Sequence, residues 1–178
     1  EELLVFDLPG GALSDMAELN ETLTARDLVD AHRECGRRFV VLLPITPLLA
    51  SISSLLTAIE LFGPDADYLV VKNMAAGKEE DFILWQDGIL NRHGQHIGGK
   101  ARAALGAANG RILELPALNA GSYARIDALG LSFTEALSSP LLPLSQRLSC
   151  RRWLHAWTGQ LDTIADWLAL PAGYRWTI

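Results

Sequence analysis

Residues 37–71 read RRFVVLLPITPLLASISSLLTAIELFGPDADYLVV, and this stretch decides the expected fold. Arg38–Leu43 and Tyr68–Val71 are short, continuous apolar runs of the kind found in strands that are buried on both faces of a parallel sheet. Between them, apolar side chains recur at helical spacing over Pro47–Phe62, and Gly63 ends the pattern. A strand, a helix and a strand joined by short connections predict a right-handed βαβ crossover.

Two further apolar runs are expected to join the same sheet. Leu3–Gly11, LLVFDLPGG, has the pattern of a buried strand that delivers Asp7 to a Pro/Gly turn, and Arg111–Leu115 is a strand that ends at Pro116. With the helices between the runs, they predict an α/β fold, a three-layer α/β/α arrangement around a mostly parallel sheet. Because 178 residues suit one globular domain, we expect residues 1–178 to form a single domain.

Helices are expected in most of the intervening segments. The predicted helical stretches are Ser14–Gly36 in two pieces, Glu79–Gln86, Lys100–Ala108, short helices after Asn119, and Leu144–Leu170. Thr24 with Asp27 three residues later predicts a capping box at the start of the second piece. The last helix carries Trp153, Trp157 and Trp167 on one stripe, which favours packing against the sheet over a surface that binds a partner.

Composition limits the class of protein. A net charge of -6 and a pI near 5.1 argue against binding nucleic acid through overall charge. Cys35 and Cys150 lie far apart and outside any CxxC pattern, which is typical of reduced thiols and predicts a cytoplasmic location. The apolar stretch Phe39–Phe62 contains Pro44 and Pro47, which favour a strand and a helix over one membrane span, and residues 1–30 do not resemble a signal peptide.

Distinctive residues stand where the expected strands end. Asp7, Thr46, Asn73 with its neighbour Lys72, and Pro116 would lie along one edge of a parallel sheet, where open α/β folds bind their ligands. Asp7 therefore occupies a place where a magnesium or phosphate site is expected. The same residue could equally be a cap on the following helix.

The order of these motifs resembles the ParA/MinD group of P-loop nucleotide-binding proteins, and in particular its StbB-like members linked to plasmid stability and mobilisation. The matching pieces are FDLPGG, VVLLPITPLLASISSLL, YLVVKN followed by a Gly-Lys segment and Trp85, RILELPAL, and GLSFTEALSS. Together they cover nearly the whole chain, although each one alone is of modest specificity.

The resemblance implies a role for six positions. Asp7 would be the acidic magnesium and switch residue, holding Mg²⁺ through water, and Pro9 and Gly10 would lie in the switch that senses the γ-phosphate. Asn73 would read the edge of adenine through its side-chain amide, which both donates and accepts hydrogen bonds. Pro116 and Leu118 would pack beside the base.

The chain departs from this family in one respect, because no stretch matches the phosphate loop GxxxxGK(S/T). Gly98-Gly99-Lys100 is not a substitute, since Ala101 stands where a hydroxyl would bind magnesium. We therefore expect the C-terminal portion of a longer chain, with ATPase activity only if a phosphate loop precedes Glu1; a degenerate relative without hydrolysis is the alternative. The complete protein would bind ATP and Mg²⁺, self-associate as a homodimer, and act with a small DNA-binding partner.

A different class of function also fits the sequence. The chain could be a non-catalytic α/β interaction module that docks a protein partner through its Trp-bearing C-terminal helix. A metal site at His93 and His96 is less favoured, because no Cys, Asp or Glu is placed to complete it.

Overall fold

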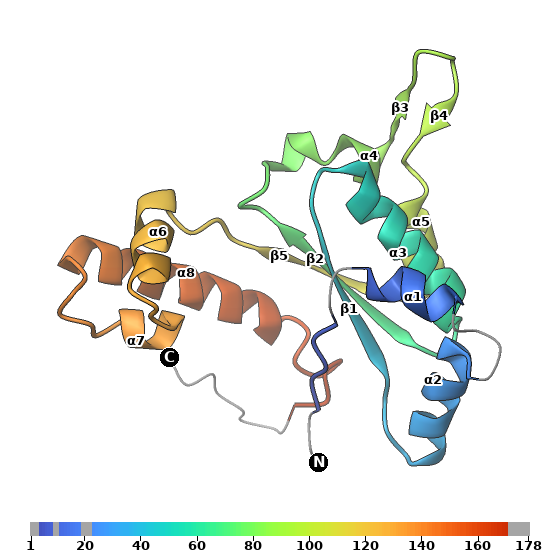
Figure 1. Cartoon of the computed structure of the whole chain (residues 1–178), viewed down its shortest axis with the longest axis horizontal. Coiled ribbons are helices and arrows are strands. Elements are labelled where there is room, and N and C mark those ends of the chain that lie inside the picture. Colours follow the sequence, from blue (N-terminus) through green and yellow to red (C-terminus); the bar gives the residue numbers. More distant parts are fainter. Residues whose placement is uncertain (1–3, 9–10, 19–22, 171–178) are drawn as a thin grey trace. The chain divides into compact units, whose positions relative to one another are not determined.

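Figure 1 shows the computed structural model of the chain, which describes residues 4–8, 11–18 and 23–170. The elements in chain order are α1 (Ala12–Glu18), α2 (Ala25–Glu34), β1 (Val40–Ile45), α3 (Leu49–Phe62), β2 (Asp67–Asn73), the 3₁₀ turn η1 (Glu79–Asp81), α4 (Ile83–Gln86), β3 (Ile89–Leu90), β4 (His96–Ile97), α5 (Ala101–Ala107), β5 (Arg111–Leu115), α6 (Ala120–Ala128), α7 (Phe133–Ala136) and α8 (Leu144–Asp162).

The main sheet of the described residues has the strand order β1-β2-β5. The backbone N–H of Asp67 donates to the carbonyl of Phe39 at 2.9 Å, which joins the starts of β2 and β1. The N–H of Met74 donates to the carbonyl of Leu115 at 3.0 Å, which joins the ends of β2 and β5. Strands that pair start with start and end with end are parallel. An α/β fold with a small, mostly parallel sheet is therefore confirmed.

The expected strand over Leu3–Gly11 is wrong for the residues that the structure describes. Leu4–Leu8 have no regular structure, and their side chains are exposed, 79% for Val5 and 73% for Phe6. An apolar run shows that a segment can form a strand, but the pattern says nothing about which neighbour would supply its backbone hydrogen bonds.

The two strands on either side of α3 differ in burial. The five central residues of β2 are all buried. In β1, Val40, Leu42 and Pro44 are exposed, whereas Ile45 is fully buried. The expectation that both strands are buried on both faces therefore holds for β2 alone.

Contacts divide the chain into two compact units, and the expectation of a single domain stays a prediction. Unit 1 comprises residues 1–43, 47–69 and 83–110. Its helices α2 and α5 pack against α3, which buries one face; the buried residues of α3 are Ile52, Leu55, Ala58 and Phe62.

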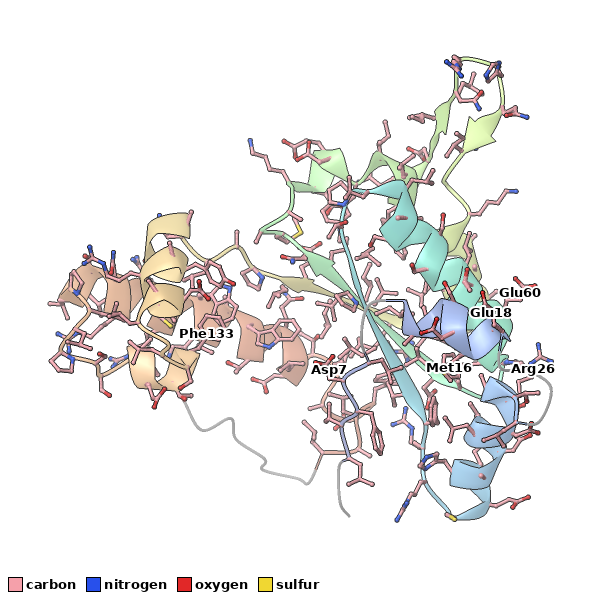
Figure 2. The ribbon with its side chains drawn as sticks, viewed as in Figure 1. Asp7, Met16, Glu18, Arg26, Glu60 and Phe133 are labelled. Carbon is pink, nitrogen blue, oxygen red and sulfur yellow. The ribbon has the colours of Figure 1, made fainter. Side chains whose placement is uncertain are left out.

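Side-chain hydrogen bonds fix the ends of helices in unit 1. Thr24 and Asp27 form the predicted capping box of α2. Arg26, near the start of α2, donates to the carbonyl of Glu60, near the end of α3, at 3.2 Å, and Figure 2 shows the two residues near each other. Tyr68 is fully buried and donates its hydroxyl to the carbonyl of Gly63 at 2.6 Å; desolvation raises the pKa of this phenol to about 12.

A β-hairpin formed by β3 and β4 also belongs to unit 1. Ile89 pairs with Ile97 and Leu90 with His96 in antiparallel register. The side-chain oxygen of Asn91 accepts the backbone N–H groups of His93 and Gln95, each at 2.9 Å, and so orders the tip.

Unit 2 comprises residues 44–46, 70–82 and 111–178, of which 171–178 lie outside the described residues. Helix α8 packs along β5, and the backbone N–H of Glu114 donates to the side chain of Gln160 at 3.3 Å. Helices α6, α7 and α8 enclose a small core whose buried members are Ile126, Ala136, Leu142 and Cys150. Burial raises the pKa of the Cys150 thiol, whereas Cys35 is exposed.

Helix α8 ends at Asp162, eight residues before the predicted end at Leu170. The N–H groups of Thr163 and Ile164 donate to carbonyls three residues back, at 3.1 Å each, so the chain tightens into turns. The hydroxyl of Thr163 also donates to the carbonyl of Gln160 at 2.6 Å. This local bond competes with continuation of the α-helix.

Candidate functional site

The ends of β2 and β5 lie side by side in unit 2 and form the candidate site. The bond from Met74 to Leu115 joins the residue after Asn73 to the residue before Pro116. Parallel strands present their carboxyl ends at one edge of a sheet, and ligands of α/β folds bind outside that edge. The structure thus brings together Asn73 and Pro116, as the sequence predicts.

Asn73 is half-buried, and part of its amide orders the turn that follows β2. Its side-chain oxygen accepts the N–H of Ala75 at 3.1 Å, and its backbone carbonyl accepts the N–H of Ala76 at 3.0 Å. Asn side chains commonly close turns in this way. The amide NH₂ is the end of this side chain that could donate to a ligand.

Pro116 and Leu118 are held from the side of α8. The indole N–H of Trp153 donates to the carbonyl of Pro116 at 2.6 Å, and the indole ring lies 4.6 Å from the ring of Phe133. Leu118 is half-buried against the core that contains Cys150. Both residues therefore offer apolar surface on a fixed backbone.

Lys72 is a charged residue at the end of β2. From the sequence it is singled out only as a neighbour of Asn73, and its ion pairs are not predicted. Its side chain is 5% exposed, and it forms ion pairs with Glu79 and, at 3.0 Å, with Glu114. Its ammonium also lies 5.5 Å from the centre of the Phe82 ring. A lysine at the end of the apolar run YLVVK is the sequence signal that could have found this cluster.

Asp7 lies on the exposed segment Leu4–Leu8 of unit 1 (Figure 2), whereas Asn73 belongs to unit 2. Pro9 and Gly10 are outside the described residues. The convergence of Asp7 with the other strand ends stays a prediction. Mg²⁺ keeps several waters and needs only one or two protein carboxylates when it also binds phosphates, so one exposed carboxylate suits it chemically.

The structure gives less support to the other candidate sites. Within the described part of the chain, no three His, Cys, Asp or Glu residues gather in a way that could hold a metal ion. His93, on the hairpin tip, accepts a hydrogen bond from the guanidinium of Arg92 at 3.0 Å. Lys100 is exposed immediately before α5.

The aromatic stripe of the C-terminal segment is largely used inside unit 2. Trp153 contacts Pro116 and Phe133, and the ring of Trp167 lies 5.9 Å from the guanidinium of Arg111. Three leucines at or just before the start of α8 are exposed: Leu141, Leu144 and Leu148 are 63%, 62% and 44% exposed.

Comparison with known proteins does not assign the chain to a family. No protein-family model, no curated protein and no solved structure matches the chain. Among the residues described, no helix combines the length and the apolar character that crossing a membrane requires.

Proposed function

We propose that this chain forms the base-binding part of a ParA/MinD-like ATP-binding protein, and that sequence preceding Glu1 supplies the phosphate loop. Such a protein would act as a Mg²⁺-dependent nucleotide switch in the stability or mobilisation of a plasmid or other mobile element. The observation that carries the proposal is the pairing of the β2 and β5 ends, which sets Asn73 beside the segment that begins at Pro116.

The chemistry of these residues suits adenine. The exposed edge of adenine offers one hydrogen-bond donor and one acceptor, and an amide is the neutral side chain that can complement both. Proline and leucine surfaces can cover the face of a purine without competing for its hydrogen bonds. In this proposal, Asn73 selects the base, and Pro116 and Leu118 exclude water from it.

The resemblance implies that the segment around Asp7 would serve the phosphates. A magnesium ion, when bound, neutralises charge on the phosphates and stabilises the transition state for transfer. Asp7 would orient the water ligands of that ion, and Pro9 and Gly10 would follow the γ-phosphate. Hydrolysis would require the phosphate loop in addition to these residues.

We predict that Asn73→Asp reverses the base preference of the full-length gene product. The carboxylate keeps an oxygen for the N–H of Ala75, so the turn is retained, but it loses the amide donor and can only accept. It therefore suits the donors of guanine better than the mixed edge of adenine. Calorimetry in the presence of Mg²⁺ should show ATP binding weakened about tenfold or more, the effect of one lost or unpaired hydrogen bond, and GTP binding strengthened.

The control is Asp81→Asn, which makes the reverse chemical change on the exposed turn η1 and should leave nucleotide preference unchanged. Absence of ATP binding by the full-length wild-type product would overturn the proposed function. Binding of ATP with the same affinity by wild type and Asn73→Asp would remove Asn73 from the site.

A second candidate function, docking of a protein partner, is favoured by the exposed leucines near the start of α8. Leu144 and Leu148 are four residues apart in α8, which places them on one face of the helix, and the exposed Leu141 precedes the helix in the turn before Pro143. The partner that can be tested directly is a second copy of the chain. Sedimentation equilibrium should show self-association that Leu144→Gln weakens about tenfold and that Ser145→Gln, on the adjacent exposed position, leaves unchanged. A monomer at all concentrations would contradict this candidate.

A further inference from the structure

Lys72 places a charge inside unit 2 that stability alone does not require. Its side chain is 5% exposed, whereas its partners Glu79 and Glu114 are about half exposed. Burying an ammonium is costly even when it is paired, and replacement of buried ion pairs by apolar residues is often neutral or stabilising. The role of the lysine therefore depends on which segments its two ion pairs hold in place.

The first ion pair closes the loop that follows Asn73. Glu79 begins η1, so its bond to Lys72 ties the far end of the loop, residues 74–78, back to the strand from which the loop departs. The near end of the same loop is the turn in which Asn73 accepts the N–H groups of Ala75 and Ala76. Both ends of the loop are thus fixed on β2.

The second ion pair joins the ends of the two strands. Glu114 precedes Leu115, whose carbonyl accepts the N–H of Met74, and Pro116 follows. The side-chain bond at 3.0 Å and the backbone bond at 3.0 Å therefore fix the same register of β2 against β5. That register decides where Pro116 lies relative to Asn73.

We infer that Lys72 is a positioning residue of the base-binding site, which sets both Asn73 and Pro116 through its ion pairs with Glu79 and Glu114. The inference rests on the proposed function. Successive side chains of a strand point to opposite faces, so Lys72 acts on Asn73 through the backbone and not by touching the base. Loss of the lysine should disturb recognition of the base more than it disturbs the fold.

The test replaces Lys72 with methionine in the full-length product, with Lys78→Met as the control. Lys78 lies in the same loop, but its side chain is 82% exposed, and its ammonium lies 4.0 Å from the carboxylate of Glu80. We expect Lys72→Met to speed hydrogen exchange at the amides of Ala75 and Ala76, to weaken ATP binding about tenfold through misplacement of Asn73, and to leave the melting temperature nearly unchanged. Lys78→Met should change none of these quantities.

A double-mutant cycle separates positioning from general disturbance. In the Asn73→Asp background, Lys72→Met should cause little further loss of ATP affinity, because residues that act through one another are not additive. Glu79→Gln, which frees the loop but leaves the pair with Glu114, should speed exchange at Ala75 and Ala76 as well. It is the second variant if Lys72→Met fails to fold.

Two results would overturn the inference. One is unchanged exchange at Ala75 and Ala76 in both Lys72→Met and Glu79→Gln. The other is an ATP affinity that falls equally in the wild-type and Asn73→Asp backgrounds. If wild type binds no ATP, the proposed function fails, but the exchange measurement still decides whether Lys72 orders the turn at Asn73.

Discussion

Trp153→Ala is expected to lower the free energy of unfolding of unit 2 by about 3 kcal/mol, as deletion of a large packed aromatic side chain does. The substitution removes the ring that lies 4.6 Å from Phe133 and leaves the carbonyl of Pro116 without its donor at 2.6 Å. Urea denaturation followed by far-UV circular dichroism measures the change. Because this side chain also holds the segment after β5, ATP affinity should fall in the same variant.

Two companion variants separate the parts of this effect. Trp153→Phe keeps an aromatic ring but loses the indole N–H, and should cost about 1 kcal/mol from the lost hydrogen bond and part of the packing. His155→Ala changes an exposed residue on the same helix and should lie within about 0.5 kcal/mol of wild type. A Trp153→Ala protein as stable as wild type would show that α8 is not held to β5 by this residue.

Gly98→Ala should be the second large effect, with a loss of about 3 kcal/mol from backbone strain and steric overlap together. Gly98 has φ +83°, a conformation that alanine adopts only with strain, and an added Cβ would lie 2.7 Å from the carbonyl oxygen of Leu84. That oxygen already accepts the N–H of Gly99 at 2.8 Å, so it cannot move without breaking the bond that seats the hairpin on α4.

The matched control is Gly94→Ala at the tip of the same hairpin. Gly94 has φ +73°, but no atom lies within 4 Å of an added Cβ. It should lose only the conformational part, about 1 kcal/mol. Chemical denaturation together with hydrogen exchange at the Gly99 amide distinguishes the two, and equal losses in both variants would show that the close contact at Gly98 has no energetic weight.

The parts of the fold that local patterns could predict are those whose causes are local. Thr24 and Asp27 cap α2 through side chains three residues apart, and Gly63 ends α3, so both boundaries could be read from a few neighbouring residues. The parallel direction of β1 and β2 follows from α3 between them, because a crossover through one helix joins parallel strands.

The parts that could not be predicted depend on partners distant in sequence. Leu4–Leu8 have the composition of a strand, but strand formation needs a neighbour that composition does not name. The hairpin at Ile89–Ile97 consists of two-residue strands, too short for any alternation to appear. At the candidate site, the ends of β2 and β5 were predicted to meet. The cluster around Lys72 was not predicted, because Glu114 reaches it from another strand.

Pro44 has a consequence for how this protein can associate with other chains. In the described sheet β1 is an edge strand, and its exposed Val40 and Leu42 make that edge apolar. Such an edge invites a foreign strand to add by backbone pairing, the first step toward fibrillar assembly. A proline carries no N–H. A strand that pairs with the free edge of β1 therefore lacks a backbone hydrogen bond from β1 at Pro44. The residue thus limits recruitment of a foreign strand to the short stretch before it.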